Sequence, residues 1–101
     1  MRPIKLSESD VEDRLRSLSD WRRTGDVILK TFEFANFIRA MEFVNQVAES
    51  AEEVQHHPDI DIRYNKVTIA LTTHDAGGLT GNDFNFANFA DEIGLATLGA
   101  A

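Results

Sequence analysis

The chain of 101 residues contains no cysteine, only two prolines and six glycines. The absence of thiols excludes a disulfide framework, a thiolate zinc site and a cysteine nucleophile. Basic side chains are also few: ten lysines and arginines face 17 aspartates and glutamates, which gives a formal net charge of −7. A chain of this sign repels a phosphate backbone, so we expect no direct contact with nucleic acid.

Long hydrophobic runs are missing as well. No apolar stretch approaches the roughly 20 residues of a membrane span, and Met1–Ser7 has no apolar segment of the kind that a secretion signal requires. We therefore expect a soluble cytoplasmic protein with no membrane contact. The chain is too short for two cores, so the prediction is a single domain over residues 1–101.

Capping chemistry predicts the first helix and the last. Ser7 stands three residues before Asp10 and opens a helix that runs to about Ser19-Asp20. Thr80 stands three residues before Asp83 and opens the last helix, and we expect the tail from Leu95 to Ala101 to fray. The residues expected in the core are Val11, Leu15 and Leu18 from the first helix, and Phe86, Ala90 and Ile93 from the last.

The longest helix is predicted from Asn36 to about Val54. It should end before Pro58, because the residue preceding a proline is biased away from the α region. Its expected core stripe is Phe37, Met41, Val44, Ala48 and Ala51.

Two β-hairpins complete the pattern. Residues 21–24 and 27–34 flank the Gly25-Asp26 turn, with Ile28, Phe32 and Phe34 on one face. Residues 59–64 and 67–72 alternate polar and apolar side chains around an Asn65-Lys66 turn. The order helix, two strands, helix, two strands, helix predicts an α+β two-layer domain, a four-stranded antiparallel sheet with helices packed on one face.

All three histidines, His56, His57 and His74, lie close together in the sequence. A two-residue Asn65-Lys66 turn would pair Tyr64 with Val67, and the same ladder, extended, would place His57 opposite His74 on the polar face of the hairpin. Histidine has an unperturbed pKa near 6.5 and can both give and take a proton near neutral pH. Such a cluster predicts acid/base chemistry.

Other interpretations of these residues stay open. Exposed histidines after a helix also fit plain solvated surface, and three imidazoles could form a metal site. Glu52 and Glu53 lie one turn before the His56-His57 pair, where a carboxylate can orient an imidazole or simply face solvent. For Asp83, the capping role at the start of the last helix is favoured over a role in the site. Trp21 could cap the core or edge a ligand pocket.

The sequence resembles the pterin-4a-carbinolamine dehydratase family. The resemblance rests on an ordered series of motifs: His56-His57-Pro58-Asp59, Tyr64-Asn65-Lys66-Val67, Thr73-His74-Asp75-Ala76-Gly77-Gly78-Leu79-Thr80 and Asp83. It covers about Trp21 to Ile93. Gln55 and Ile60 stand where some members carry an acidic residue and a tryptophan, a departure that concerns the shape of the pocket and leaves the histidines in place.

The resemblance implies a cofactor-independent lyase that removes water from 4a-hydroxytetrahydrobiopterin, a pterin-4a-carbinolamine, and gives the quinonoid dihydropterin in support of tetrahydropterin recycling. By the family pattern, His56 and His74 would be the acid/base pair and His57 would position the pterin. The substrate-binding residues would be Pro58, Thr73, Asp75 and Ala76, with Glu52 and Asp83 adjusting the imidazoles; no metal or cofactor is implied.

The resemblance also implies partners. We expect a homo-oligomer, either a dimer or a tetramer, and a functional link to an aromatic amino-acid hydroxylase. Two further functions fit the same family: a non-catalytic dimerisation or binding module, and a pterin-binding protein of another pathway. Retention of all three histidines favours the enzyme.

Overall fold

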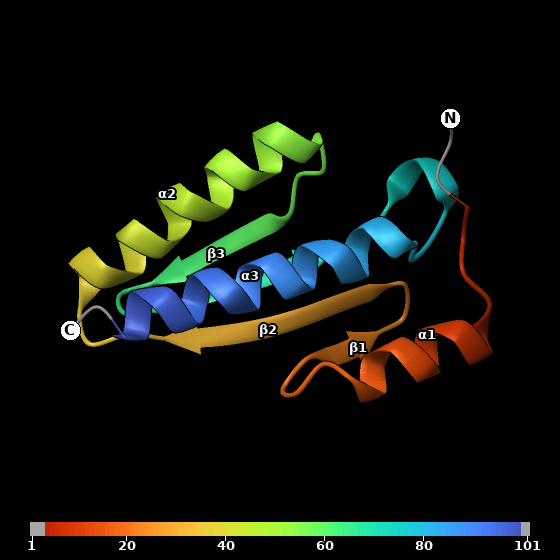
Figure 1. The fold of residues 1–101 in the computed structure, drawn as a ribbon, viewed down its shortest axis with the longest axis horizontal. Coiled ribbons are helices and arrows are strands. Elements are labelled where there is room, and N and C mark those ends of the chain that lie inside the picture. Colours follow the sequence, from red (N-terminus) through yellow and green to blue (C-terminus); the bar gives the residue numbers. More distant parts are fainter. Residues whose placement is uncertain (1–3, 100–101) are drawn as a thin grey trace.

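The computed structural model describes residues 4–99. In chain order the elements are α1 (Glu8–Arg16), β1 (Arg22–Thr24), β2 (Val27–Glu33), α2 (Phe37–Val54), β3 (Asp59–Arg63), β4 (Lys66–Leu71), the 3-10 helix η1 (His74–Ala76) and α3 (Gly81–Gly99). The strands form one antiparallel sheet in the order β1-β2-β4-β3, with the helices on one face (Figure 1). The predicted two-layer α+β fold is confirmed. Within residues 4–99, none of the helices combines the length and apolar character that crossing a bilayer requires.

One face of the sheet carries the core. Strands β2 and β4 pair so that Ile28 lies opposite Leu71 and Phe32 lies opposite Val67, and all four side chains are buried. The other face is polar: Thr31 and Thr68 lie opposite each other there and share a hydrogen bond of 2.8 Å. The alternation of the sequence therefore gives a sheet that packs on one side only, as expected for a two-layer domain.

Aromatic rings join the sheet to α2. The ring of Phe43 lies 4.7 Å from that of Phe32 and 5.0 Å from that of Phe34, measured between centroids, and Phe43 is fully buried. Helix α3 crosses the same cluster at Gly94, where a Cβ atom would stand 3.0 Å from the Phe32 ring. The absence of a side chain at Gly94 lets α3 approach this closely.

The expected core stripe of α2 is confirmed at Ala51, and Val44 packs against the core, but the stripe is wrong in its rotation about the helix axis. Phe37 and Ala48 are exposed, whereas the residues of α2 that are buried are Ala40, Phe43, Val47 and Ala51. The stripe is turned by roughly 60° from the predicted one, as the 3.6-residue repeat shows. The cause is tertiary, because the helix turns Phe43 toward the aromatic cluster and the apolar Phe37 is left outside.

The second hairpin turns one residue earlier than predicted. Ile62 pairs with Val67 and Arg63 with Lys66, so the two turn residues are Tyr64 and Asn65, and the prediction that Tyr64 pairs with Val67 is wrong. Asn65 is held by the end of β2: its carbonyl accepts from the Phe34 amide at 2.9 Å, and its side-chain amide donates to the Phe34 carbonyl at 2.8 Å. These bonds place Asn65 in the turn.

Two helix ends also differ from the predictions. Helix α1 ends at Arg16, and residues 17–20 form a turn that includes Asp20 in the left-handed region at φ 68°. Helix α3 continues to Gly99 without fraying at Leu95, with Thr97 buried and its hydroxyl bonded to the Ile93 carbonyl at 2.9 Å. Residues 100–101 of the predicted tail lie outside the described residues.

Helix α1 is attached to the edge strand β1 by an ion pair between the half-buried Arg23 and the exposed Glu8. The Arg23 guanidinium donates two hydrogen bonds to the Glu8 carboxylate, at 2.7 and 2.9 Å. The hydrogen bond from Arg23 lowers the pKa of Glu8 below its usual value and raises the pKa of Arg23. The stabilisation is therefore present above the ordinary pKa of a glutamate and is lost as the pH falls through the lowered value.

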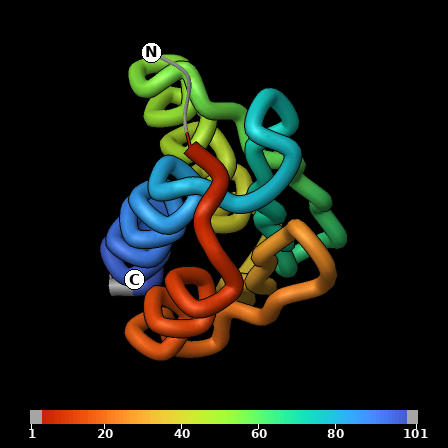
Figure 2. The backbone as a smooth tube through the Cα atoms, turned by 90° about the vertical axis from the view of Figure 1, so that its right-hand side faces the viewer, coloured from red at the N-terminus to blue at the C-terminus, as the bar shows by residue number. Residues whose placement is uncertain are grey.

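The N-terminal segment braces the loop between β4 and α3. The Leu6 amide donates to the Leu79 carbonyl at 2.8 Å, and Figure 2 shows the segment crossing the chain at that point. Lys5 covers Gly78, because a Cβ atom there would stand 2.7 Å from its Cε. On the other side, the Thr72 hydroxyl donates to the Asp26 carbonyl at 2.6 Å. The loop that carries His74 is therefore tied to the segment before α1 on one side and to the turn between β1 and β2 on the other.

Asp91 joins α3 to β2 and to Trp21, the residue before β1. It accepts from the Trp21 indole N–H at 3.1 Å and from the Lys30 ammonium at 2.8 Å. The Lys30 and Asp91 side chains are only 18% and 26% exposed. Trp21 is buried and caps the core.

We predict that Asp91→Ala lowers the free energy of unfolding by about 2 kcal/mol, because it leaves a partly buried ammonium and an indole N–H without their acceptor. Urea unfolding followed by the fluorescence of Trp21, the single tryptophan, measures the change. The matched control is Asp61→Ala, whose Arg63 partner is 82% exposed. It should cost less than about 0.5 kcal/mol. Equal losses in the two variants would contradict a structural role for the Asp91 cluster.

Candidate active site

The carboxylate of Asp83 is the centre of the site. Asp83 lies in the first turn of α3 and is fully buried, at 0% exposure. Its Oδ2 accepts from the Thr80 amide at 2.9 Å, while the Thr80 hydroxyl accepts from the Asn82 amide at 3.2 Å. These two bonds form the predicted capping box. The cap uses only one carboxylate oxygen, which leaves Oδ1 for another partner.

That partner is His56, at the end of α2. Gln55 ends the helix in the left-handed region at φ 53°, and the His56 amide bonds back to the Ala51 carbonyl at 3.1 Å. The chain reversal turns the imidazole toward α3, where its Nε2 lies 2.6 Å from Asp83 Oδ1. The side chain is only 12% exposed. We assign Nε2 as the donor to this carboxylate oxygen, and Nδ1 is then the ring nitrogen left for a ligand.

The same carboxylate holds the loop that carries His74. The Thr73 hydroxyl donates to Asp83 Oδ2 at 2.8 Å and lies 2.9 Å from the Thr80 hydroxyl. Since Thr73 gives its hydrogen to Asp83, the Thr80 hydroxyl is the donor between the two. An isolated bridge between Thr73 and Gly78 closes the loop around η1, so His74 starts a short tight turn and is itself exposed.

His57 lies in different surroundings. Its Nε2 contacts the Glu52 carboxylate on the exposed side of α2, with the His57 side chain 58% exposed. The prediction that His57 pairs with His74 in the hairpin is wrong: the ladder of β3 and β4 starts at Asp59, and β4 ends at Leu71. Pro58, which has no amide hydrogen to donate to a ladder, separates His57 from the first paired residue.

The remaining residues predicted for the site lie around this network. Pro58 is half-buried between the histidines and β3. In η1, Asp75 is exposed and Ala76 is half-buried. Among residues 4–99, no group of three or more histidine, aspartate or glutamate side chains is arranged to hold a metal ion.

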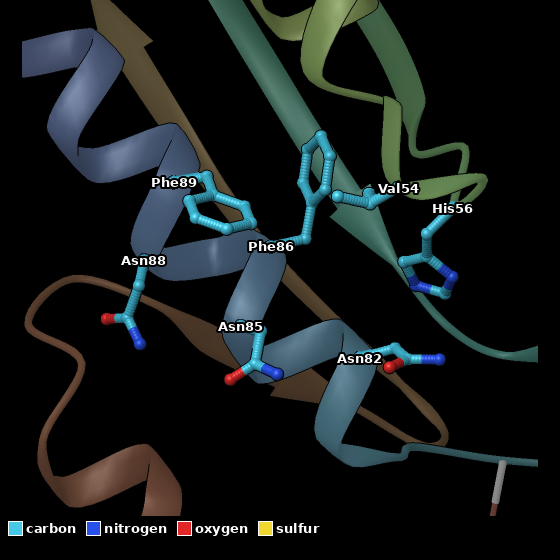
Figure 3. A pocket seen from close by; sticks show the side chains of 7 residues that line it. All are labelled: Val54, His56, Asn82, Asn85, Phe86, Asn88 and Phe89. Carbon is cyan, nitrogen blue, oxygen red and sulfur yellow. The ribbon is translucent and has the colours of Figure 1, made fainter. Parts of the chain in front are cut away.

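A pocket of about 390 Å³ opens beside His56, between the end of α2 and the first half of α3 (Figure 3). Its lining residues are Val54, His56, Asn82, Asn85, Phe86, Asn88 and Phe89. The rings of Phe86 and His56 are 6.4 Å apart, and those of Phe86 and Phe89 are 6.3 Å apart and nearly perpendicular. A concave site with an apolar wall and a few polar groups is typical of small-molecule binding.

The sequence analysis missed the α3 wall of this pocket. Asn82, Asn85 and Asn88 recur every three residues, so they share one side of the helix, and this spacing was the available signal. Figure 3 shows their carboxamides along one side of the wall, with Phe86 and Val54 on the other. Thr80 was predicted as a cap only, although it also bonds to Thr73.

Comparison with known proteins adds an independent finding. The model of the family described as pterin 4 alpha carbinolamine dehydratase matches residues 4–93. Proteins from Roseiflexus sp. (strain RS-1) and Picosynechococcus sp. are 54% and 46% identical over 89 residues, which is 88% of this chain and 96–97% of theirs. Both are provisionally named pterin-4-alpha-carbinolamine dehydratase.

Solved structures agree. A transcriptional coactivator/pterin dehydratase from Brucella melitensis is 34% identical, with a TM-score of 0.86 over 89% of this chain and 98% of that one. A pterin dehydratase-like protein identified as a RuBisCO assembly factor in the alpha-carboxysome is 26% identical, with a TM-score of 0.64 over 74% and 89%. By the family match, the sequence identities and the fold, this chain belongs to the pterin 4 alpha carbinolamine dehydratase family.

Proposed function

We propose that this protein dehydrates 4a-hydroxytetrahydropterin to the quinonoid dihydropterin by histidine acid/base catalysis. The observation that carries the proposal is the contact of His56 Nε2 with the buried Asp83, at the edge of a ligand-sized pocket. Membership of the dehydratase family supports the reaction type. Thr73 bonds the loop of His74 to the same carboxylate, so Asp83 holds both the His56 ring and the segment that carries His74.

The reaction needs one proton given and one proton taken. The hydroxyl on C4a leaves as water after its oxygen is protonated, and N5 loses its proton as the C4a–N5 double bond of the product forms. No oxidant or reductant is consumed. His56 would exchange its proton at Nδ1, because Nε2 is occupied by Asp83. His74, exposed on η1, would serve the other proton transfer.

The other residues of the site would bind and orient. We assign His57 to positioning the pterin, with Glu52 fixing the His57 ring by the contact at the end of α2. Pro58 and the loop segment 73–76 would line the bound ring. Asp83 is a positioning residue in this scheme, since it acts through His56 and does not face the pocket.

The reaction would belong to recycling of a tetrahydropterin that an aromatic amino-acid hydroxylase uses, in the cytoplasm. We also propose a homo-oligomer of two or four chains. In the described sheet, β1 and β3 are the edge strands, and each has one side that is not paired with another strand. The alternatives are a pterin-binding protein of another pathway and a non-catalytic binding module. The binding module is supported by the names of the two solved relatives, because one is a transcriptional coactivator/pterin dehydratase and the other an assembly factor. A rate measurement separates it from the enzyme.

We predict that His56→Ala and His74→Ala each lower the rate of dehydration at least about tenfold, because each removes one proton-transfer group. Stopped-flow absorbance of enzymatically generated 4a-carbinolamine measures its decay with and without protein. His57→Ala should weaken substrate binding more than it slows the bound complex.

The control is Glu49→Gln, an exposed change on α2 that should leave the rate unaltered. Circular dichroism verifies that each variant keeps its fold. Decay that the unmodified protein does not accelerate would exclude the enzyme and favour the binding module. Acceleration that survives both histidine substitutions would contradict the acid/base assignment.

We further predict that Asp83→Asn lowers kcat at least about tenfold with little change in KM. A carboxamide that still accepts from the Thr80 amide turns its NH₂ group toward His56, so Nε2 must accept and the proton moves to Nδ1, the wrong tautomer. The ¹⁵N chemical shifts of the His56 ring report this exchange directly.

Asp83→Ala provides the comparison, since it also removes the cap of α3 and should lower the free energy of unfolding by about 1–3 kcal/mol. An Asp83→Asn protein with an unchanged His56 tautomer and a lower kcat would show that the carboxylate acts by some other route. An unchanged kcat in Asp83→Asn would contradict the assignment of Asp83 as the residue that positions His56.

A further inference from the structure

The position of the His74 ring depends on the backbone of its loop. The rings of His56 and His57 each contact a carboxylate. Within the described chain, no carboxylate contacts the His74 ring in this way, and His74 is exposed at the start of η1. Its distance from His56 is therefore set by how firmly the loop is held. A misplacement of about 1 Å can slow a reaction by about 100-fold.

Two backbone hydrogen bonds close the loop. The Thr73 amide donates to the Gly78 carbonyl at 3.2 Å, and the Gly78 amide donates to the Thr73 carbonyl at 3.3 Å. Both bonds are longer than the roughly 2.9–3.0 Å that is most common. The Thr73 end is also fixed from inside, because its hydroxyl bonds to Asp83. Gly78 has no side chain that could form such a bond, so its end of the loop depends on neighbouring segments.

The N-terminal segment supplies that support. The Leu6 amide donates to the Leu79 carbonyl, and the Leu6 side chain packs against the core. A Cβ atom at Gly78 would stand 2.7 Å from Lys5 Cε, 3.2 Å from Lys5 Cδ and 3.4 Å from Asp26 Oδ1. Gly78, which is buried, therefore lies against two segments that are distant from it in the sequence, and Figure 2 shows the N-terminal one crossing the chain there.

The contact with Lys5 explains why residue 78 is a glycine. Positive φ angles occur at Gly25 and Gly77, whereas the backbone at Gly78 lies outside the left-handed region. Space, not backbone freedom, requires the glycine, because a side chain would meet the Lys5 stem. The nearest Lys5 atoms are methylene carbons, and a lysine can pack its stem on a surface while its charged head stays in water. The contact is therefore one of packing.

We propose that residues 5–6 hold the loop from outside and thereby position His74 for proton transfer, with the stem of Lys5 packed on Gly78. Lys5 is a positioning residue in this inference, since it acts through the loop and not on the substrate. The inference rests on the proposed function, because it takes His74 as a proton-transfer group. The hold on the loop can nevertheless be measured without the reaction.

Amide hydrogen exchange measures that hold. Lys5→Gly should raise the exchange rates of the Thr73 and Gly78 amides at least about threefold, because the loop opens more easily. Lys5→Met keeps a long apolar stem and removes the charge, so these rates should stay within about 1.5-fold of those in the unmodified protein. The His56 amide, bonded to the Ala51 carbonyl, is the reference for opening of the whole fold and should not change.

Two further variants locate the contact. Ile4→Gly is the matched control: it adds the same backbone freedom one residue earlier, where the side chain is 79% exposed, and should leave the loop amides unchanged. Gly78→Ala displaces the Lys5 stem from the other side and should raise the exchange rate of the Thr73 amide. Added to Lys5→Gly, it should raise that rate no further, because the two changes remove one contact.

The rate of dehydration tests the positioning of His74. Lys5→Gly should lower kcat at least about threefold, and Lys5→Met should restore it. Because the segment acts through His74, the loss should shrink below about 1.5-fold in a His74→Ala protein and persist in a His56→Ala protein. A general loss of stability would not depend on which histidine is present.

The outcomes separate this inference from the proposed function. Unchanged exchange in Lys5→Gly, or the same increase in Ile4→Gly, would overturn the hold on the loop. Faster exchange with an unaltered kcat, or a loss of kcat that persists in His74→Ala, would overturn the positioning of His74. If the unmodified protein does not accelerate carbinolamine decay, the dehydratase fails, while faster exchange in Lys5→Gly and not in Lys5→Met would still support the hold on the loop.

Discussion

Three separate segments of the chain meet at the carboxylate of Asp83. The end of α2 reaches it through His56, the loop after β4 through Thr73, and the start of α3 through the Thr80 amide. A buried carboxylate with no partner would be strongly destabilising, so each of these donors is required by the fold as well as by the site. Among the described residues, no buried side-chain polar atom is left without a partner. The cost of burying Asp83 thus fixes the two loops that hold the histidines.

The sequence could predict the elements of this arrangement but not how they come together. Capping pairs and alternation gave the helices, the strands and the position of Asp83 at the start of α3, because these signals depend on near neighbours. Local patterns could not predict that the second oxygen of Asp83 contacts His56, because the two residues are 27 positions apart in the sequence. Only the family resemblance indicated that Asp83 acts on an imidazole. The capping interpretation of Asp83 is confirmed at one oxygen; the other oxygen contacts His56, and the role of Asp83 in the site stays a prediction.

The errors have the same origin. Tyr64 adopts the left-handed conformation at φ 53°, which a tyrosine seldom does, because Asn65 is held by the end of β2. Likewise, α2 is rotated by the packing of Phe43 on two rings of the sheet, which leaves Phe37 46% exposed. Local patterns set which residues form a strand or a helix. Contacts between elements set the register and the rotation, and with them the exact surroundings of each histidine.

The burial of Asp83 has a consequence for how the site responds to its medium. Dissolved ions screen charges that they can surround, such as the exposed Arg16–Asp13 and Arg63–Asp61 pairs on the surface. They have no access to a carboxylate at 0% exposure whose partner His56 is itself almost covered. The orientation of the His56 imidazole therefore does not depend on ionic strength, whereas the strength of the exposed ion pairs does. A high salt concentration would weaken the ion pairs on the surface of this acidic molecule and would leave the contact between His56 and Asp83 as it is in dilute buffer.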